Sequence, residues 1–253
     1  HFVVTFDDIS ELMSAQRMAA WADVARRIAH EIKNPLTPIL LSAERLRRKY
    51  ATEIVTEPEV FTRLTETITR QVRDIGRLID EFSSFAQMPA PVLREENLIE
   101  IARQAVFQQQ LAAHATTIRF TPPEHPVMLA CDRAQITQAL VNIIKNAIEA
   151  IDARKKTDPG DGIILLRLDT DDLQRIVLSV IDNGCGLPRE ARHRLTEPYV
   201  TTREQGTGLG LAIVRKIAED HGARITLSDV SEILSPEELG IDWRAGAVVQ
   251  IIF

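Results

Sequence analysis

The chain has 253 residues, of which 45% are apolar and 26% are charged, so it can bury one large core or two smaller ones. A formal net charge of -6 at pH 7 provides no general basic field, which argues against direct binding of nucleic acid. The two cysteines, Cys131 and Cys185, lie far apart without metal-type spacing, which argues against a disulfide framework or a zinc site as the organising feature.

The beginning of the chain has the pattern of a strand that runs into a helix. Residues 2–6 are β-branched and aromatic, and the polar side chains at 7–11 suit a helix cap. No apolar run reaches the roughly 18 residues that a membrane span requires, and no signal-peptide layout is present. Because the first residue is His1 and not a methionine, we expect a piece of a longer protein whose anchoring segments lie outside it.

Two amphipathic segments follow, and their spacing predicts an antiparallel helical hairpin over residues 11–88. In the first, apolar residues alternate at intervals of four and three, as in a coiled-coil seam: Met18, Ala22, Ala25, Ala29, Ile32, Leu36, Ile39, Ala43, Leu46 and Tyr50. Thr56 and Glu59 then have the spacing of a capping box. A second, less regular stripe consists of Phe61, Leu64, Ile68, Val72, Ile75, Ile79, Phe82 and Phe85. A single hairpin leaves part of these stripes exposed, so we expect a homodimer that forms a four-helix bundle.

The remainder of the chain predicts a second domain of mixed secondary structure. Pro89 and Pro91 cannot continue a helix and indicate a linker over 89–94. In residues 95–253 the patterns predict helices near 97–113, 133–153 and 209–221, and strands near 117–120, 127–130, 163–169, 175–182, 224–228 and 247–253. The expected fold is therefore a multidomain α+β chain, in which a hairpin precedes an α/β sandwich with helices on one side of a mixed sheet.

His30 is the candidate reactive residue of the hairpin. It lies just off the seam and shares an outward stripe with Asn34, one turn further along. The neutral imidazole can attack a phosphorus atom, and the neighbouring Glu31 can take or orient the ring proton. Pro35 and Pro38 each remove a backbone donor and favour a bend beside it. Taken alone, the His-Glu pair also fits an ordinary surface histidine, whereas a His-Glu-x-x-His zinc site is excluded because Asn34 replaces the second ligand.

Two stretches of the second domain are suited to the base and the metal of a nucleotide. Asn142 and Asn146 lie one turn apart on one helix face, and the amide oxygen of Asn146 is a hard ligand suited to Mg²⁺. Asp182 ends a predicted strand, where a buried carboxylate can accept from an exocyclic amine, while Gly184 and Gly186 allow backbone to approach a ring. Alone, each stretch also fits local hydrogen bonding or a tight turn.

A third stretch is suited to phosphate. It opens a predicted helix and presents backbone donors and the positive end of the helix dipole: Gly206, Thr207, Gly208, Leu209 and Gly210. No lysine follows these glycines as in a Walker motif, and no strand precedes them as in a Rossmann fingerprint. Cys185, between the two glycines of the second stretch, is expected to be a small filler residue.

Together these motifs resemble the sensor histidine kinases. Residues 29–37, Ala-His-Glu-Ile-Lys-Asn-Pro-Leu-Thr, resemble the H-box of the HisKA type. The three nucleotide stretches, with residues 197–203 between the last two, resemble the N, G1, F and G2 boxes of the family's ATPase domain, in the same order. The resemblance implies a Bergerat-type fold that binds ATP and Mg²⁺ under an ATP lid at 187–205. It adds nucleotide contacts at Lys145, Tyr199, Thr202 and Arg203, and Tyr199 stands where the family usually has phenylalanine.

The same resemblance assigns roles within the hairpin. It implies that His30 is the phosphoacceptor, that Glu31 is its general base, and that Asn34 supports dephosphorylation of a response regulator whose receiver domain docks on the hairpin. Gyrase-type ATPases of this nucleotide fold carry a water-activating glutamate where this chain has Asn142, so transfer to His30 is favoured over hydrolysis. Two alternatives remain, a regulator whose main output is Asn34-dependent dephosphorylation and a nonenzymatic dimeric scaffold.

The flanking residues resemble a narrower group. Residues 21–28 and 41–46 resemble the nitrogen-regulation kinases of the NtrY type, which implies an NtrX-like regulator. Residues 1–10 resemble the end of a PAS domain. By this resemblance the chain is the cytoplasmic portion of a sensor anchored in the inner membrane.

Overall fold

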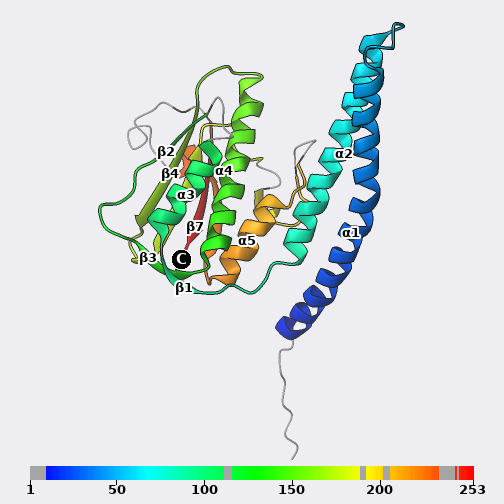
Figure 1. Cartoon of the computed structure of the whole chain (residues 1–253). Coiled ribbons are helices and arrows are strands. Elements are labelled where there is room, and N and C mark those ends of the chain that lie inside the picture. Colours follow the sequence, from blue (N-terminus) through cyan, green and yellow to red (C-terminus); the bar gives the residue numbers. More distant parts are fainter. Residues whose placement is uncertain (1–9, 111–115, 189–191, 202–205, 234–242, 244) are drawn as a thin grey trace, which may run out of the picture. The chain divides into compact units, whose positions relative to one another are not determined.

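The computed structural model describes residues 10–110, 116–188, 192–201, 206–233, 243 and 245–253 (Figure 1). The chain divides into two compact units, His1–Pro89 and Ala90–Phe253. The strand predicted at 2–6 lies outside the described residues. Among the described helices, none has both the length and the apolar character that a membrane span requires.

The first unit is the predicted hairpin, formed by α1 (Ser10–Tyr50) and α2 (Pro58–Ala86). α1 runs through Pro35 and Pro38 without interruption. Its side chains are described from Arg27 onward. The two helices lie side by side, and the buried residues between them are Ala29, Ala43, Thr65, Thr69, Val72, Ile79 and Ala86. Cross-helix ion pairs join Arg73 to Glu44 at 2.7 Å and Lys33 to Asp80, which fits the antiparallel register.

The apolar stripe predicted for the second helix divides between two faces. Val72 and Ile79 are buried against α1, whereas Leu64, Ile68 and Ile75 are exposed. Thr65 and Thr69, which lie beside this stripe, are buried instead. The Thr65 hydroxyl donates to the carbonyls of Phe61 and Thr62, at 3.0 and 2.9 Å, so its burial leaves no unpaired polar group. A single chain therefore leaves an apolar face of the hairpin uncovered.

The capping box predicted at the start of the second helix is wrong. α2 begins at Pro58, and its N-cap is Glu57, whose left-handed backbone (φ 53°, ψ 53°) makes no side-chain cap bond. Proline is well suited to the first helical position because its φ is preset and its missing N–H has no helical partner there. The helix therefore starts one residue later than a Thr56 cap requires, and the Thr56 to Glu59 spacing has no capping role.

The second unit contains the predicted mixed sheet. Among the described strands, five form a sheet in the order β2-β4-β5-β7-β6, with β2 parallel to β4 and the other neighbours antiparallel. Their bounds are Thr116–Phe120 (β2), Gly162–Thr170 (β4), Ile176–Asp182 (β5), Arg224–Asp229 (β6) and Ala247–Ile252 (β7). Two further strands, β1 (Arg94–Asn97) and β3 (Met128–Cys131), pair with each other antiparallel. The all-polar β1 has no alternation, so the sequence did not indicate it.

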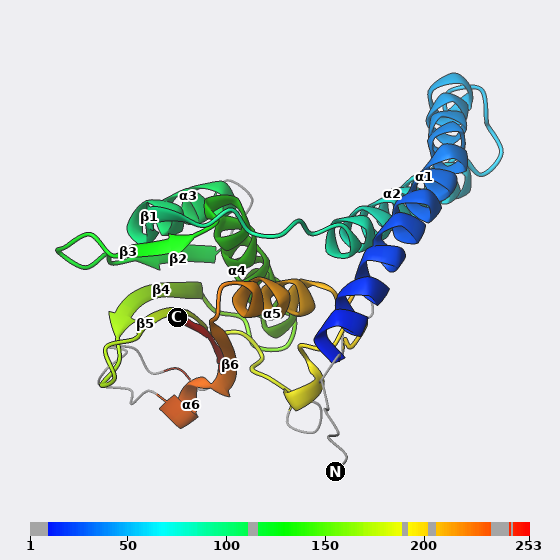
Figure 2. The same ribbon diagram turned by 90° about the horizontal axis from the view of Figure 1, so that it is seen from below.

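Helices α3 (Leu98–Gln110), α4 (Arg133–Lys155) and α5 (Gly210–Asp220) lie on one face of the sheet, as Figure 2 shows. The largest side chains buried between these layers include Ile136, Leu140, Ile144, Ile151, Ile164, Leu166 and Leu178. Burial of each such side chain stabilises the domain by roughly 1.5–3 kcal/mol before the entropy cost of ordering it. This layering confirms the α/β sandwich predicted from the sequence.

A smaller core lies on the opposite face of the sheet. The short helix α6 (Val230–Ile233) follows β6 directly, and Val230 packs against Ile181 and Val248. Trp243 and Leu165 extend this cluster. The sequence did not predict this second layer, and a turn of 3-10 helix at Arg192–Arg194 was also not predicted.

Candidate functional site

The hairpin presents its candidate reactive residues on the surface. His30, Glu31 and Asn34 are all exposed on α1, next to the buried Ala29. The Glu31 carboxylate accepts from Nε of Arg27 at 2.8 Å, an exposed pair one helical turn long. Such a pair contributes little energy and holds the carboxylate on the same surface as His30. The histidine and a proton acceptor are therefore both within reach of a second molecule or domain.

Asp182 forms the buried anchor of the second site. It ends β5 with only 4% of its surface exposed, and its Oδ1 accepts from the backbone N–H of Gly184 at 2.8 Å. A Cβ on Gly184 would lie 2.7 Å from the Ala150 side chain and 2.8 Å from the Ala150 carbonyl carbon. Only glycine allows this loop to approach α4 so closely. The Asp182 carboxylate and the glycine backbone of the loop therefore lie side by side. A flat polar ring could hydrogen-bond to the carboxylate and lie against the backbone.

The neighbouring residues of this loop differ from the sequence prediction. Asn183 is buried, its Oδ1 accepts from Ile163 N at 2.9 Å, and its Nδ2 donates to Asp161 O at 2.9 Å. It therefore ties the loop to the start of β4, a role that the sequence analysis missed although an Asp-Asn-Gly turn was visible. Cys185 was expected to be a filler, but it is exposed, next to Gly186 with its left-handed φ of +75°.

Asn146 on α4 meets the glycine-rich turn. A Cβ on Gly210 would lie 3.5 and 3.7 Å from the two amide atoms of Asn146, so the first residue of α5 passes directly beside that side chain. One turn earlier, Nδ2 of Asn142 is buried and makes no hydrogen bond to any described residue. A buried donor without a protein partner favours an acceptor supplied by a ligand. Lys145 is exposed on the same helix.

The glycine-rich turn is held in a fixed conformation. Thr207 Oγ1 accepts from Leu209 N at 3.2 Å, and Leu209 is buried as the N-cap residue of α5. Gly208 has φ +69°, and a Cβ there would lie 2.6 Å from the carbonyl carbon of Tyr199. Tyr199 N donates to Gly208 O at 3.1 Å, which joins the two stretches. Gly206 is described and half-buried.

Tyr199 combines strain with exposure. Its backbone has φ +66°, and 59% of its surface is exposed, while burial of the remainder raises the pKa of its phenol above the ordinary value. A non-glycine residue in the left-handed region carries a conformational cost and is enriched at functional sites. Thr202 and Arg203, predicted to contact the nucleotide, lie outside the described residues.

These residues fit Mg-ATP by their chemistry. The structure brings Asn146 beside Gly210, Gly208 beside Tyr199, and the Asp182 to Gly184 loop beside Ala150 of α4. In the described part of the chain, no group of three or more His, Cys, Asp or Glu side chains is placed to hold a metal alone. A Mg²⁺ ion at this site would take the Asn146 amide oxygen, with phosphate and water as its other ligands.

Two family models match the chain. One, described as the His Kinase A (phospho-acceptor) domain, matches residues 20–91, and the other, described as the histidine kinase-, DNA gyrase B- and HSP90-like ATPase, matches residues 131–252. The first range includes His30, and the second includes all three nucleotide stretches. The chain belongs to the sensor histidine kinases.

Curated relatives place this histidine kinase close to the nitrogen-regulation group. It is 55% identical to the nitrogen regulation protein NtrY of Azorhizobium caulinodans over 91% of the chain and 30% of that protein. It is 39% identical to a putative NtrY-like sensor histidine kinase of Rickettsia felis over 88% of the chain and 36% of that protein. The sensory histidine kinase/phosphatase NtrB of Rhodobacter capsulatus is 31% identical over 91% and 66%. The chain thus spans roughly a third of the first two relatives.

Solved structures share the fold of this histidine kinase. Full-length ShkA in complex with AMPPNP matches with a TM-score of 0.63 and 22% identity over 91% of this chain and 45% of that one. The histidine kinase ThkA, in complex with the response regulator protein TrrA, matches with a TM-score of 0.60 and 25% identity over 98% and 68%. Both support the predicted order of a helical hairpin followed by an α/β ATPase domain.

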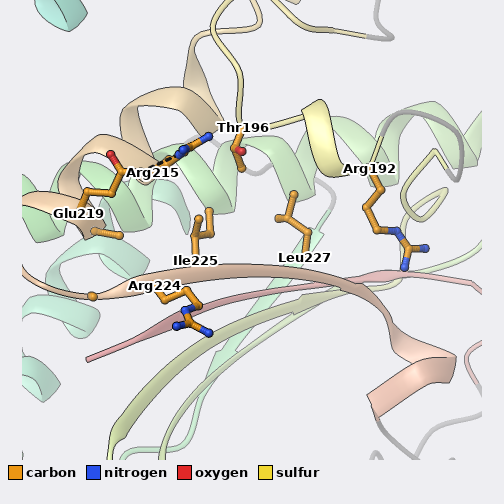
Figure 3. Close-up of a pocket in the computed structure, with 9 residues that line it drawn as sticks. Arg192, Thr196, Arg215, Glu219, Arg224, Ile225 and Leu227 are labelled. Atoms are coloured by element: carbon orange, nitrogen blue, oxygen red, sulfur yellow. Dashed lines mark hydrogen bonds and ion pairs between the residues drawn. The ribbon is translucent and has the colours of Figure 1, made fainter. Parts of the chain in front are cut away.

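The kinase also has a groove of about 670 Å³ away from the predicted nucleotide residues. It lies between α5 and β6 and is lined by Arg192, Thr196, Arg215, Ala218, Glu219, Ala223, Arg224, Ile225 and Leu227. Figure 3 shows Ile225 and Leu227 pointing from β6 toward the helix, with the Arg215 to Glu219 ion pair on α5. The motif residues line a different part of the domain, so this groove is not the predicted ATP site.

Proposed function

We propose that this chain catalyses ATP-dependent phosphorylation of its own His30 and passes the phosphoryl group to an aspartate of a response-regulator receiver domain. The observation that supports this most directly is the pairing of two features, an exposed His-Glu pair on the hairpin and the contact of Asn146 with the glycine-rich turn at Gly210. Each feature alone has an ordinary structural explanation. A nucleotide site and a phosphate acceptor in one chain together define a transferase.

The proposed transfer balances with groups that this chain supplies. An imidazole nitrogen of His30 forms a bond to the γ-phosphorus, and the bond from that phosphorus to the bridging oxygen breaks, so that ADP leaves with the electron pair. The ring proton passes to the Glu31 carboxylate, which is the neighbouring base on α1. Bound Mg²⁺ supplies neutralisation of phosphate charge.

The nucleotide side favours transfer over hydrolysis. We assign the buried Asp182 carboxylate to the exocyclic amine of adenine, and the amides of the glycine-rich turn, from Gly206 to Gly210, to the phosphates. Position 142 carries an amide, which cannot take a proton from water as a glutamate would. The Asn142 Nδ2 donor, buried without a described partner, suits a nucleotide acceptor.

We also assign a second activity and the partners. Asn34 is exposed one turn beyond His30, where its amide can position water for dephosphorylation of the regulator. The similarity to NtrY favours an NtrX-like regulator in nitrogen signalling and a cytoplasmic portion of an inner-membrane sensor. The uncovered apolar face of the hairpin supports homodimerisation.

The test is incorporation of label from γ-labelled ATP with Mg²⁺. The wild-type chain is expected to gain an acid-labile label, as a phosphoramidate does, and His30→Gln is expected to gain none. His125→Gln is the matched control, because His125 is an exposed histidine of the other unit. A wild-type chain that binds ATP and remains unlabelled contradicts the kinase and favours the regulator or scaffold. Asn34→Ala, with labelling intact and regulator dephosphorylation lost, would establish the second activity.

A further inference from the structure

The start of the predicted lid segment, 187–205, is fastened to the end of β6 by one carboxylate. Oδ1 of Asp229 accepts from the backbone N–H of Leu187 at 3.1 Å, and Oδ2 forms an ion pair with the guanidinium of Arg192. Leu187 directly follows the glycine loop that begins after Asp182. A single side chain therefore holds two points of the lid segment that lie five residues apart.

A second carboxylate completes this network. Nη1 of Arg192 donates to both oxygens of Glu232 on α6, at 2.9 and 2.7 Å. Oε2 of Glu232 also accepts from the backbone N–H of Asp229 at 3.1 Å, so the two acids are fixed relative to each other. We refer to Arg192 with Asp229 and Glu232 as the Arg192 clamp. Arginine suits this position because its planar guanidinium directs separate N–H donors to two carboxylates in a fixed geometry, which the flexible ammonium group of lysine does not provide.

The Arg192 clamp is partly buried, unlike most ion pairs among the described residues. The Arg192 and Asp229 side chains are 22% and 21% exposed, whereas the Arg215 to Glu219 pair on α5 is 49% and 55% exposed. Solvent screens a partly buried pair less than an exposed one, so its geometry is held more firmly. The hydrogen bonds to Glu232, followed by the charge of Asp229, raise the pKa of Arg192, and the guanidinium stays charged.

The far side of the segment is also fixed. Leu195 and Thr196 are buried just after Arg192, and Tyr199 is joined to Gly208 at the base of the glycine-rich turn. Figure 3 shows the Arg192 side chain pointing toward the end of β6. The clamp therefore sets where the segment leaves the adenine loop, and the contact with Gly208 sets where it rejoins the phosphate loop.

We propose that Arg192 is a positioning residue, which through Asp229 and Glu232 fixes Leu187 and residues 192–199 between the adenine loop and the glycine-rich turn and thereby sets the affinity for Mg-ATP. The ATP part of this inference rests on the proposed kinase function, whereas the clamping itself does not. Neither acid belongs to a nucleotide motif, because both lie at the junction of β6 and α6.

The test compares Arg192→Gln with Arg215→Gln in the full chain. Arg215 is a matched control, since it lines the same groove in an ion pair with a glutamate of its own helix and is not a member of the Arg192 clamp. In Arg192→Gln, amide hydrogen exchange in peptides covering 187–199 should become about fivefold faster, while exchange in α4 stays unchanged. The KM for ATP should rise about fivefold with little change in kcat, and Arg215→Gln should match wild type in both measurements.

Two further variants keep the inference open to refutation. Arg192→Lys retains the charge but not the fork, so its exchange rate should fall between those of wild type and Arg192→Gln. Glu232→Gln removes the half-exposed acid and should accelerate exchange in the same peptides even if Arg192→Gln folds poorly. Unchanged exchange in both Arg192→Gln and Glu232→Gln overturns the clamp. Faster exchange with unchanged nucleotide affinity retains the clamp and overturns its role in ATP binding, and an inactive wild-type chain refutes only the kinase proposal.

Discussion

The backbone N–H of Asp132 donates to Nε2 of His221 at 2.9 Å and so joins the beginning of α4 to the end of α5. Because Nε2 accepts, the ring proton lies on Nδ1, which is 2.8 Å from the carbonyl oxygen of Ile217 and donates to it. At the other end of α5, Gly210 meets Asn146 of α4. The two helices that carry the proposed nucleotide-binding residues are therefore fixed relative to each other at two separate points.

Asp132 is expected to contribute strongly to the stability of the second unit. Its carboxylate caps α4 by accepting from Ala134 N and Gln135 N, and its other oxygen accepts from Val92 N at 3.0 Å. Asp132→Ala should lower the free energy of unfolding by about 1–2 kcal/mol, measured by urea denaturation at pH 7. Asp132→Asn is the control, because an amide oxygen still caps the helix. Equal stability of Asp132→Ala and wild type would contradict the capping role.

The contribution of Asp132 should depend on pH with a defined sign. The hydrogen bond from Val92 N–H, and then those from α4, lower the pKa of the Asp132 carboxyl below its ordinary value. Because the carboxyl has a lower pKa in the folded state, its ionised form stabilises the fold fully at pH values above the unfolded-state pKa of about 3.9. This stabilisation is lost as the pH falls through the folded-state pKa. The stability difference between wild type and Asp132→Asn should therefore shrink from pH 5 toward pH 3, and a constant difference would refute this linkage.

Gly184→Ala is expected to impair nucleotide binding. The added Cβ would lie 2.7 Å from the Ala150 side chain and 2.8 Å from a backbone carbon, so the loop or α4 has to move. We expect at least about a tenfold loss of affinity for Mg-ATP and a destabilisation of roughly 1–3 kcal/mol, measured by calorimetry and thermal unfolding. Gly160→Ala is the control, since its Cβ would meet only the Arg154 guanidinium at 3.9 Å. Wild-type affinity in Gly184→Ala would exclude this loop from the site.

The two cysteines should differ in reactivity. Burial, chiefly, raises the pKa of Cys131 to about 11, so only about one thiol in 1000 is ionised at pH 8, whereas Cys185 is exposed in the proposed adenine loop. A thiol reagent at pH 8 should label one cysteine rapidly and the other only on unfolding, and Cys185→Ser should remove the rapid phase. Mg-ATP should slow the labelling of Cys185. If saturating Mg-ATP leaves the labelling rate of Cys185 unchanged, the adenine ring does not bind at this loop.

The need for glycine in the loops of the proposed site was predictable from sequence because that requirement is local. Gly184 and Gly208 each allow backbone to touch backbone, and only glycine allows that contact. Asn183 and Arg192 were not identified, because their partners are Asp161 and Asp229, which only the folded sheet brings near. Sequence spacing cannot show such pairings.

The hairpin shows a similar division between pattern and contact. Apolar residues at intervals of four and three residues predict a broad apolar stripe on a helix. They do not show which side of that stripe packs against the other helix of the hairpin and which side remains exposed. For this reason Thr65 is buried and Leu64, one residue earlier, is exposed. Packing against α1 decides which edge is covered.

The open edge of this stripe yields a prediction on assembly. Ile39 of α1 and Ile68 of α2 are exposed in the single chain and belong to apolar rows that also include Ile32, Leu46, Leu64 and Ile75. If these rows form the centre of a homodimer, Ile68→Glu places two unpaired carboxylates there, which should weaken the dimer by at least about 100-fold. Sedimentation equilibrium should then show a monomer with an unchanged helical spectrum. Val55→Glu is the control, because Val55 lies in the loop that connects α1 to α2 and is 87% exposed. This substitution is expected to leave the dimer intact. A dimer of undiminished affinity in Ile68→Glu would show that the chains associate through another surface.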